Sequence, residues 1–425
     1  MFRLRHINRR STGFTRAPGT KLDTNAIVDS YKYANYMSVS QPTAQLGKCT
    51  NSQLWNRAIK NAHVYGSRIN LSVGSKSVHT CVQFRTYYGK ASTTYSKEHN
   101  QQTKTVYDMR SDTVTKPCKG MRQAIASAMV GDDVFEDDYS IRSLEERVAK
   151  LCGMEKALFC PSGTMTNQLA LRVHVGALES VVMDHRAHIF HYEGGGLSYH
   201  SQAQALPTQP KAGERHLTAD VVEAAIFAED IHCPTTTLVS LENTLHGSVM
   251  PLQYMVDIKK MADEKGVKVH LDGARLWNAS VASGVSIEEY CKNVESVSLC
   301  LSKTLGAPIG SLLVGDHAFI TKARKFRKMF GGGWRQAGLL AAGAMYAIDH
   351  NWGSTMQAVF DRTKALGEGL RDHGILVNEQ FGGEIETNML WLEFAPFLEK
   401  HDCDLYTVGQ ALESRGVLIF AGRRG

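Results

Sequence analysis

The fold is indicated by the stretch Val267-Lys-Val-His-Leu-Asp272-Gly-Ala-Arg275, in which an apolar strand ends in an acid followed by glycine. In an open α/β sheet, ligands bind outside the carboxyl ends of the parallel strands, so an acid at such an end points into the ligand crevice. Helix capping is the alternative role for Asp272, and this stretch by itself leaves both roles open.

Short apolar segments alternate with helical patterns on both sides of that stretch. The other predicted strands are Ala157–Cys160, Leu178–Met183, Thr237–Leu241, Val297–Leu301 and Ser311–Val314. Apolar periodicity predicts helices over Leu144–Leu151, Thr166–Val173 and Leu252–Lys265. This alternation predicts an α/β fold with a mostly parallel, mixed sheet covered by helices. We expect one domain over residues 107–348 and a smaller α+β domain over residues 349–425.

A candidate anion site follows the first of these strands, in Phe159-Cys-Pro-Ser-Gly-Thr-Met165. Ser162, Gly163 and Thr164 would place backbone N–H groups and a hydroxyl at a helix N-terminus, which suits a cofactor phosphate. A capped helix without a ligand is the commoner situation, so this motif is weak evidence when taken alone.

A lysine follows another strand, in Ser296-Val-Ser-Leu-Cys-Leu-Ser-Lys303, 31 residues after Asp272. That separation corresponds to about one crossover unit, so Lys303 would reach the same edge of the sheet as the acid. Enclosure there would lower the pKa of its ammonium group and favour imine formation. In a pyridoxal-phosphate site, Asp272 would hold the pyridine nitrogen protonated and make the ring a better electron sink.

Histidines gather in Val182-Met-Asp-His-Arg-Ala-His-Ile-Phe-His191, between the anion site and the acid. Such an imidazole could stack on a cofactor ring. The spacing of His185 and His188 also occurs in metal sites, but no matching acid or third ligand is evident, and we expect no metal. The nine cysteines form no CxxC pair, which favours a reducing compartment.

The charge is unevenly distributed: residues 1–107 carry a net +13, the remainder −7, and the whole chain +6. Residues 1–22 contain arginines and no acid, as is typical of a mitochondrial presequence, and a disordered basic tail is the alternative. Residues 23–106 lack a sustained period, and we assign them neither fold nor function. No segment approaches the ~20 apolar residues needed to span a bilayer, so we expect a soluble protein.

Eight ordered motifs together resemble the L-threonine aldolases, over a region from Tyr107 to about Gly425. They are Asp108-Met-Arg-Ser-Asp-Thr-Val-Thr-Lys-Pro117, Val130-Gly-Asp-Asp-Val134, Pro161-Ser-Gly-Thr-Met165, His188-Ile-Phe190, Leu241-Glu-Asn-Thr244, His270-Leu-Asp-Gly-Ala-Arg275, Leu301-Ser-Lys303 and Gly331-Gly-Gly-Trp-Arg-Gln-Ala-Gly338. The resemblance implies the fold of type I pyridoxal-phosphate enzymes, a homotetramer with shared active sites, and a cytoplasmic location. It also implies cleavage of L-threonine or L-allo-threonine to glycine and acetaldehyde.

The resemblance implies a role for each matching residue. Lys303 would bind pyridoxal phosphate covalently, Asp272 would pair with the pyridine nitrogen, and His188 would stack on the ring near the substrate hydroxyl. The phosphate ligands implied are Ser162, Gly163, Thr164 and, from a neighbouring subunit, Arg335. The residues implied for the substrate carboxylate and the cofactor's phenolic oxygen are Ser111 and Arg275.

Three departures from the family pattern affect these expectations. The chain has Leu245-His246-Gly247 where many members have His-Asn, which leaves open whether His246 replaces the usual histidine. Phe135 stands where a tyrosine is common. The family continues past Gly425 with a strand that carries a carboxylate-binding arginine, and Arg423 and Arg424 precede that position. Alternatives are therefore another pyridoxal-phosphate lyase or aminotransferase, an impaired subunit and, from the basic extension alone, a nucleic-acid-binding protein.

Overall fold

The structure is a computed structural model, and it describes residues 106–420. The predictions for residues 1–22 and for Arg423 and Arg424 lie outside the described residues, as does nearly all of the segment 23–106. Among the described helices, none is long and apolar enough to cross a membrane.

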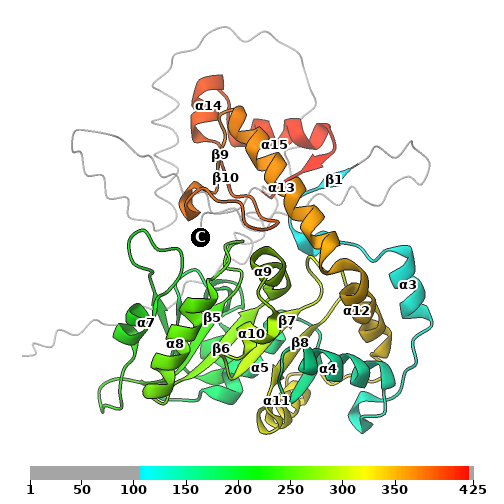
Figure 1. Ribbon diagram of the computed structural model, residues 1–425, viewed down its shortest axis with the longest axis vertical. Coiled ribbons are helices and arrows are strands. Elements are labelled where there is room, and N and C mark those ends of the chain that lie inside the picture. The colour runs from blue at the N-terminus through cyan, green and yellow to red at the C-terminus, as the bar shows by residue number, and fades with distance from the viewer. Residues whose placement is uncertain (1–105, 421–425) are drawn as a thin grey trace, which may run out of the picture. The chain divides into compact units, whose positions relative to one another are not determined.

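A seven-stranded mixed sheet forms the centre of the described region (Figure 1), with the strand order β2-β8-β7-β6-β5-β3-β4. Only β8 runs antiparallel to its neighbours. The strands are β2 (Lys156–Cys160), β3 (Glu179–Asp184), β4 (Gln204–Thr208), β5 (Thr235–Glu242), β6 (Lys268–Gly273), β7 (Ser296–Cys300) and β8 (Ser311–Gly315).

The predicted α/β fold is confirmed, and each of the six predicted strands overlaps an observed one. The edge strand β4 was not predicted. Its residues are mostly half-buried or exposed and include Pro207, which lacks a backbone N–H, so the segment has no apolar alternation to mark it. The prediction missed this strand because an edge strand needs to bury little.

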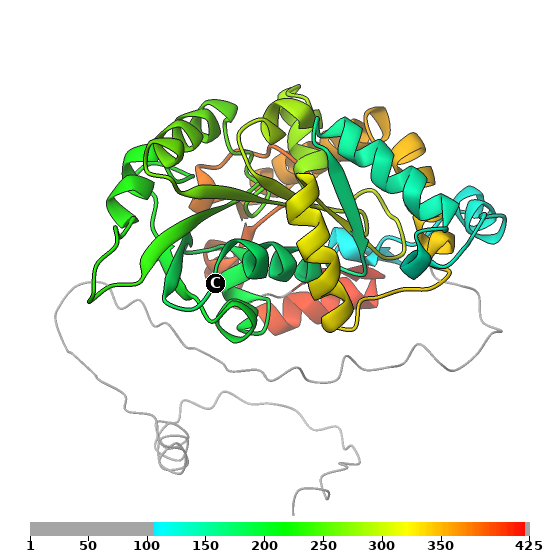
Figure 2. The same ribbon diagram turned by 90° about the horizontal axis from the view of Figure 1, so that it is seen from below.

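Helices cover both faces of the sheet (Figure 2). One face packs its main apolar core against α4 (Tyr139–Leu151), α7 (Ala219–Ala225), α8 (Leu252–Glu264), α9 (Leu276–Ser283), α10 (Ile287–Cys291) and α12 (Gly338–Asn351). The other face packs against α5 (Gly163–His174) and α11 (His317–Met329). Because both faces are covered, the central strands are almost entirely buried, and polar groups are reachable mainly at the strand ends.

The C-terminal part is built from shorter elements. The helix α13 (Ser354–Asp372) leads into β9 (Leu376–Val377), β10 (Leu392–Glu393), α14 (Ala395–His401), α15 (Leu405–Ser414) and β11 (Val417–Leu418). The strand β11 pairs in parallel with β1 (Tyr107–Asp108), so the first and last described strands lie side by side (Figure 1). The predicted domain boundary at residue 349 falls in the last turn of α12 and stays a prediction.

Candidate active site

The loops that follow five parallel strands bring polar side chains to one edge of the sheet. The strand β5 ends in Glu242, and Asp272 is the last residue but one of β6. His188 lies four residues after the end of β3, and Lys303 three residues after the end of β7. The helix α5, with Ser162 as its N-cap, follows β2. The sheet therefore collects in one place the acid, lysine, imidazole and helix N-terminus that the sequence pattern predicted.

Asp272 is 2% exposed, and both of its carboxylate oxygens accept hydrogen bonds. Oδ1 accepts the backbone N–H of Ala274 at 3.0 Å, and Oδ2 accepts Nδ2–H of Asn167 at 2.7 Å. Hydrogen bonds donated to both oxygens hold a carboxyl group in one orientation. Asp272 is thus a buried acceptor with a fixed direction.

His188 is held by a second buried acid. Its Nδ1 lies 2.9 Å from Oε1 of Glu193, whose side chain is fully buried. Burial acts to lower the pKa of His188, but the hydrogen bond to Glu193 and the charges of Asp272 and Glu193 outweigh it and raise that pKa. The imidazole therefore has one nitrogen anchored and the other free for a further partner.

Glu242 lies behind this histidine and accepts the backbone N–H of His188 at 2.8 Å. Desolvation and the nearby charge of Asp272 raise the pKa of Glu242 to about 8, against the opposing influence of His188 and Lys303. Such a carboxyl group carries a proton at neutral pH more often than an ordinary glutamate does.

Arg275 forms a bidentate ion pair with Asp112, with nitrogen–oxygen distances of 2.8 and 2.7 Å. Burial acts to raise the pKa of Asp112, but Arg275 and the hydroxyl of Thr304 outweigh it and lower that pKa to about 2. Asn388, from the C-terminal part, also donates to Asp112 at 3.3 Å. Ser111 caps the short helix η2 (Asp112–Val114) through the backbone N–H of Thr113.

The start of α5 offers an anion site. The hydroxyl of Ser162 accepts the backbone N–H of Met165 at 3.1 Å. A methyl group added at Gly163 would lie 3.6 Å from Oγ of Ser311. That buried hydroxyl has no hydrogen-bond partner among the described residues. An unpartnered buried hydroxyl beside a helix N-terminus suits an anion such as a phosphate.

Two further predicted residues have partners of their own. The ring of His246 packs against Trp391 and Phe381 at centroid distances of 5.0 and 5.5 Å. Burial and the charge of Arg186 lower its pKa to about 4. Arg335 is 59% exposed and pairs with Asp132 at 3.0 Å within its own chain. Its predicted contact with a phosphate in a neighbouring subunit stays a prediction.

These residues fit pyridoxal phosphate. An aromatic pyridinium needs a buried anion, which Asp272 supplies, and a flat ring needs a stacking partner, which His188 can provide. A phosphate needs the N–H groups and hydroxyls at the start of α5. Lys303 is half-buried at the same edge, where its charge helps to lower the pKa of Asp112 and opposes the rise in the pKa of Glu242.

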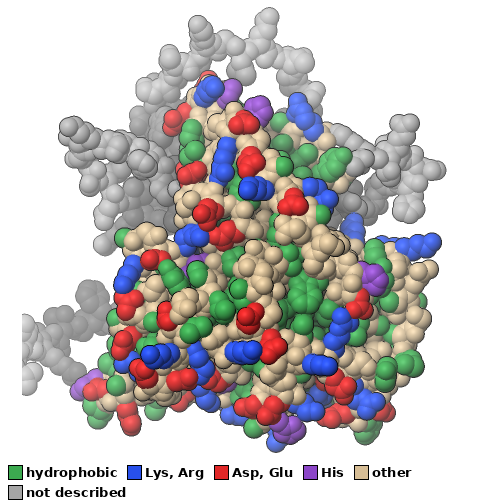
Figure 3. Space-filling model, viewed as in Figure 1, with side chains coloured by type: hydrophobic (Ala, Val, Ile, Leu, Met, Phe, Trp, Pro, Cys, Tyr) green, Lys and Arg blue, Asp and Glu red, His purple; other side chains and the backbone are tan. Residues whose placement is uncertain are grey.

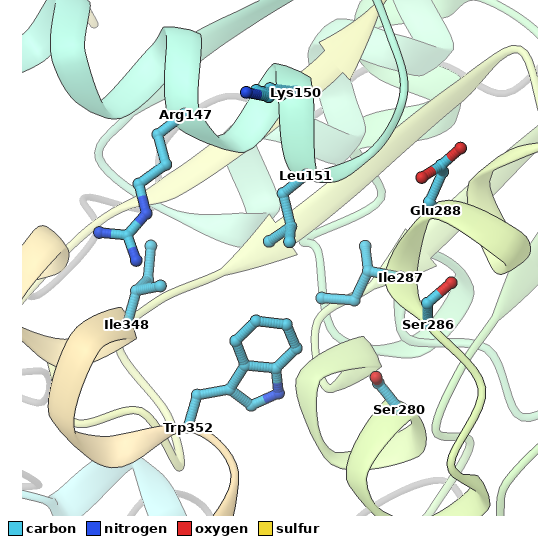
Figure 4. Close-up of a pocket in the computed structure, with 9 residues that line it drawn as sticks. All are labelled: Arg147, Lys150, Leu151, Ser280, Ser286, Ile287, Glu288, Ile348 and Trp352. Atoms are coloured by element: carbon cyan, nitrogen blue, oxygen red, sulfur yellow. The ribbon is translucent and has the colours of Figure 1, made fainter.

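A surface pocket with a volume of about 540 Å³ lies elsewhere, between α4, α9, α10 and α12. Figure 3 shows hydrophobic side chains gathered in a hollow on this face, and Figure 4 shows Leu151, Ile287, Ile348 and Trp352 around the pocket with Arg147 and Lys150 at its side. None of the predicted site residues lines it. The chemistry of the sheet edge is therefore independent of this hollow.

Sequence reasoning assigned no role to four polar residues in the cluster. They are Asp112, Asn167, Glu193 and Glu242. Asp112 and Glu242 stand within quoted motifs, and Asn167 and Glu193 each stand two residues after a quoted stretch. The hydrogen bonds of Asn167 to Glu193 and Asp272, and of Asp112 to Arg275, span 26 to 163 positions in sequence, whereas that of Glu193 to His188 spans 5. The sequence offered one signal for them: the adjacent polar residues Asn167 and Gln168 stand on the buried face of a helix.

The family profile described as Beta-eliminating lyase matches residues 108–394 of this chain. The low-specificity L-threonine aldolase of Candida albicans is 43% identical over 293 residues, which cover 68% of this chain and 77% of that protein. The low specificity L-threonine aldolase of Escherichia coli strain K12 is 38% identical over 314 residues, which cover 74% of this chain and 90% of that protein.

Solved structures show the same fold. The threonine aldolase of Leishmania major has a TM-score of 0.60 at 21% identity and covers 70% of this chain and 88% of its own. A putative L-allo-threonine aldolase of Listeria monocytogenes has a TM-score of 0.56 at 24% identity and covers 68% of this chain and 78% of its own.

Proposed function

The chain belongs to the Beta-eliminating lyase family, and from this premise we propose that it is an L-threonine aldolase. It cleaves L-threonine or L-allo-threonine to glycine and acetaldehyde with pyridoxal phosphate as cofactor. The observation that carries the proposal is the convergence of Asp272, Lys303, His188 and the start of α5 at one sheet edge. The similarity to the curated aldolases of Candida albicans and Escherichia coli supports the choice of substrate.

Each residue has a distinct task in this proposal. Lys303 would hold the cofactor covalently through its amino group. Ser162, Gly163 and Thr164 would hold the phosphate of the cofactor, with Arg335 of a second subunit. Asp272 would bind the pyridine nitrogen. The bound cofactor supplies an electron sink for the pair released when the bond between Cα and Cβ breaks.

Substrate orientation is the task of Ser111 and Arg275. Because Asp112 occupies one side of the Arg275 guanidinium, Arg275 is fixed in direction before substrate arrives. A rigid guanidinium binds a carboxylate through parallel hydrogen bonds and so restricts its rotation. That restriction selects which bond at Cα is aligned for cleavage.

Proton transfer from the β-hydroxyl is assigned to Nε2 of His188, the nitrogen that Glu193 leaves free. Only the neutral imidazole accepts a proton, and the pKa of His188 is raised, so activity increases as the pH rises through that pKa. The lowered pKa of His246 keeps that ring neutral at neutral pH, and His246 is the alternative base. Substitution of each histidine by alanine separates the two.

The test combines an absorbance spectrum with product analysis. Purified full-length chain with pyridoxal phosphate should show a visible band that changes on addition of glycine or threonine. Threonine should yield equal amounts of glycine and acetaldehyde. A keto acid as product would instead identify an aminotransferase on the same fold. A bound cofactor without any product would identify an impaired subunit.

We also propose that the chain forms a homotetramer, in which contacts between subunits cover an apolar surface beside Arg335. Exposed apolar side chains gather on the loop that holds Asp132 and on the neighbouring ends of α11 and α12. They are Met129, Val130, Val134, Phe135, Tyr139, Met329 and Leu339. Phe135 is the most exposed of them, at 77%, and an exposed apolar surface of this kind is typical of a contact between protein subunits. Light scattering on Phe135→Asp should show smaller particles than the wild type, whereas Ile231→Asp, at another exposed position, should leave the mass unchanged.

In the cell, such an activity would consume threonine and supply glycine. The family resemblance favours the cytoplasm, and the basic residues 1–22 favour a mitochondrial destination. Imaging of the full chain and of a form lacking residues 1–22, each fused to a fluorescent protein, distinguishes the two compartments.

A further inference from the structure

A line of buried polar side chains leads from Asp272 to the far end of α5. Its members are the half-buried His174 and the buried Ser296, His270 and Asn167, which we call the buried polar chain. His270, Ser296 and Asn167 are at most 1% exposed. None of them belongs to the residues assigned above to cofactor or substrate.

The secondary structure explains why these side chains meet. His270 and Asp272 are two residues apart on β6 and therefore share a face of the strand. Ser296 is the register partner of His270 on β7. Asn167 and His174 are seven residues apart on α5, which places both on the side of that helix that packs against the sheet.

The hydrogen bonds of Asn167 fix its orientation. Its Nδ2 lies 2.7 Å from Oδ2 of Asp272 and 2.9 Å from Oε1 of Glu193. Carboxylate oxygens accept, so the amide nitrogen must face them with its two hydrogens. The carbonyl oxygen of Asn167 consequently faces Nε2 of His270, at 3.4 Å, and can only accept.

This orientation determines every other hydrogen in the chain. The carbonyl of Asn167 therefore places the hydrogen of His270 on Nε2. Burial lowers the pKa of His270 to about 4, against the opposing influence of Asp272 and of the backbone of Ser296, so the ring is neutral and its Nδ1 is left to accept. Ser296 then has to donate its hydroxyl hydrogen to that Nδ1, across 2.8 Å. The oxygen of Ser296 in turn accepts from Nε2 of His174, also across 2.8 Å.

All donors therefore point the same way, toward the two carboxylates. Burial lowers the pKa of His174 to about 2, so this ring is neutral, and its Nδ1 has no hydrogen-bond partner among the described residues. Hydrogen bonds aligned in one direction polarise one another and strengthen the last bond of the series. At this end of the series, the amide of Asn167 donates to both Asp272 and Glu193. Asp272 is the partner assigned to the ring nitrogen of the cofactor, and Glu193 is the partner of His188.

We propose that Asn167, His270 and Ser296 are positioning residues that set the charge state of the active site. Through the single amide of Asn167 they hold Asp272 as the acceptor for the ring nitrogen and Glu193 as the acceptor for His188. The inference rests on the proposed function for its consequences in the loaded enzyme. The hydrogen-bond directions themselves are a property of the protein alone.

The first test needs no cofactor. Histidine side-chain ¹⁵N spectra of the full chain should show His270 neutral, with its hydrogen on Nε2, from pH 6 to 8. In Asn167→Ala, Nε2 of His270 loses its acceptor, so the spectrum should change to a mixture of both tautomers. A wild-type His270 with its hydrogen on Nδ1, or an unchanged spectrum in Asn167→Ala, would overturn the proposal whether or not the chain is an aldolase.

The second test uses chain loaded with pyridoxal phosphate. In Asn167→Ala, the pyridine nitrogen of the cofactor should lose its proton more readily. The nitrogen that joins the cofactor to Lys303 should then keep its own proton to higher pH. We expect the pH midpoint of the visible band to rise by about one unit and kcat to fall about tenfold with little change in KM. Ser296→Ala should shift the midpoint in the same direction by a smaller amount.

The control is Ser180→Ala, which removes an equally buried hydroxyl of the same sheet that bonds to Thr236 at 2.9 Å. Its midpoint and kcat should match the wild type. Equal midpoints in Asn167→Ala, Ser180→Ala and the wild type would contradict the proposal. Wild-type chain that binds cofactor but does not cleave threonine would instead contradict the proposed function and leave the tautomer result to decide this one.

Discussion

The strands β6 and β7 and the C-terminal segment from β10 to β11 are held in the fold in different ways. Apart from the exposed Lys268 at the start of β6, every residue of the two central strands is buried, and each strand is paired along both of its edges. In the C-terminal segment, β10 and β11 are two residues long, and α14 and α15 contain no buried residue.

The difference separates two tasks. Groups that must keep one position, such as Asp272 and Lys303, are attached to elements that can move only if the main core opens. Groups that must admit a substrate lie next to elements that have few buried contacts. Such elements open locally at a low cost in free energy. Asn388, in the loop before β10, joins the C-terminal part to the site, because it bonds to Asp112 and to Thr304 at 3.3 and 3.1 Å.

Loss of Lys303 should have the largest effect, since no other lysine lies in the cluster. We expect Lys303→Ala to lose at least about 10³-fold in kcat. Borohydride reduction of the wild type should fix the cofactor to the peptide that contains Lys303, and the variant should show no such labelled peptide. Lys292→Ala, at an exposed position on the same chain, is the control. Label on another peptide in the wild type would refute the assignment.

Asp272→Asn should follow in size. The amide cannot hold a protonated ring nitrogen, and loss of one partner of a buried ionic contact typically costs several kcal/mol, which corresponds to about 10²–10³-fold in kcat. Cofactor occupancy, measured by absorbance after dialysis, should fall much less than kcat. Wild-type turnover in a fully loaded variant would show that the ring nitrogen has another partner.

Glu193→Gln should change the pH dependence more than the maximal rate. The charge of Glu193 helps to raise the pKa of His188, so its removal lowers that pKa. The acidic limb of the profile of kcat against pH should therefore move to lower pH, by about one unit. An acidic limb that stays in place would favour His246 or a water molecule as the base.

Asn388→Ala should affect KM more than kcat, because it weakens the contact between the C-terminal part and the Asp112–Arg275 pair but leaves the cofactor contacts intact. We expect KM for threonine to rise about fivefold to tenfold, as for one hydrogen bond to a charged group. Gln357→Ala, which removes an exposed bond to Asp361 on α13, is the control. A fall in kcat at constant KM would place Asn388 in the chemical step.

The smallest change is expected without any mutation, in hydrogen exchange of the native chain. Backbone amides of α14 and α15 should exchange well before those of β6 and β7, because local opening of the helices exposes little apolar surface. Addition of glycine to the loaded enzyme should slow the exchange of the C-terminal helices more than that of the strands. Equal rates of amide exchange in the C-terminal helices and the central strands would show that the two regions do not differ in local stability.

The sequence predicted the central strands well because buried strands are continuous apolar runs, such as Val297–Leu301. It also located Asp272 and Lys303, because a strand end followed by a loop is visible in sequence. It did not locate Glu193 or Asn167, whose importance arises only when α5 is packed on the sheet. It gave no separate boundaries for α14 and α15, since elements that bury nothing carry a weak apolar pattern.

The pairing of β1 with β11 has a consequence for biosynthesis. Tyr107 and Val417 are register partners although they lie 310 positions apart in sequence, so the contact closes a loop that spans nearly all of the described residues. A ribosome must release almost the whole described region before this contact can form, whereas the strands from β3 to β7 can pair as they emerge. The sheet should therefore be assembled first on a nascent chain, and the pocket for substrate should be completed last.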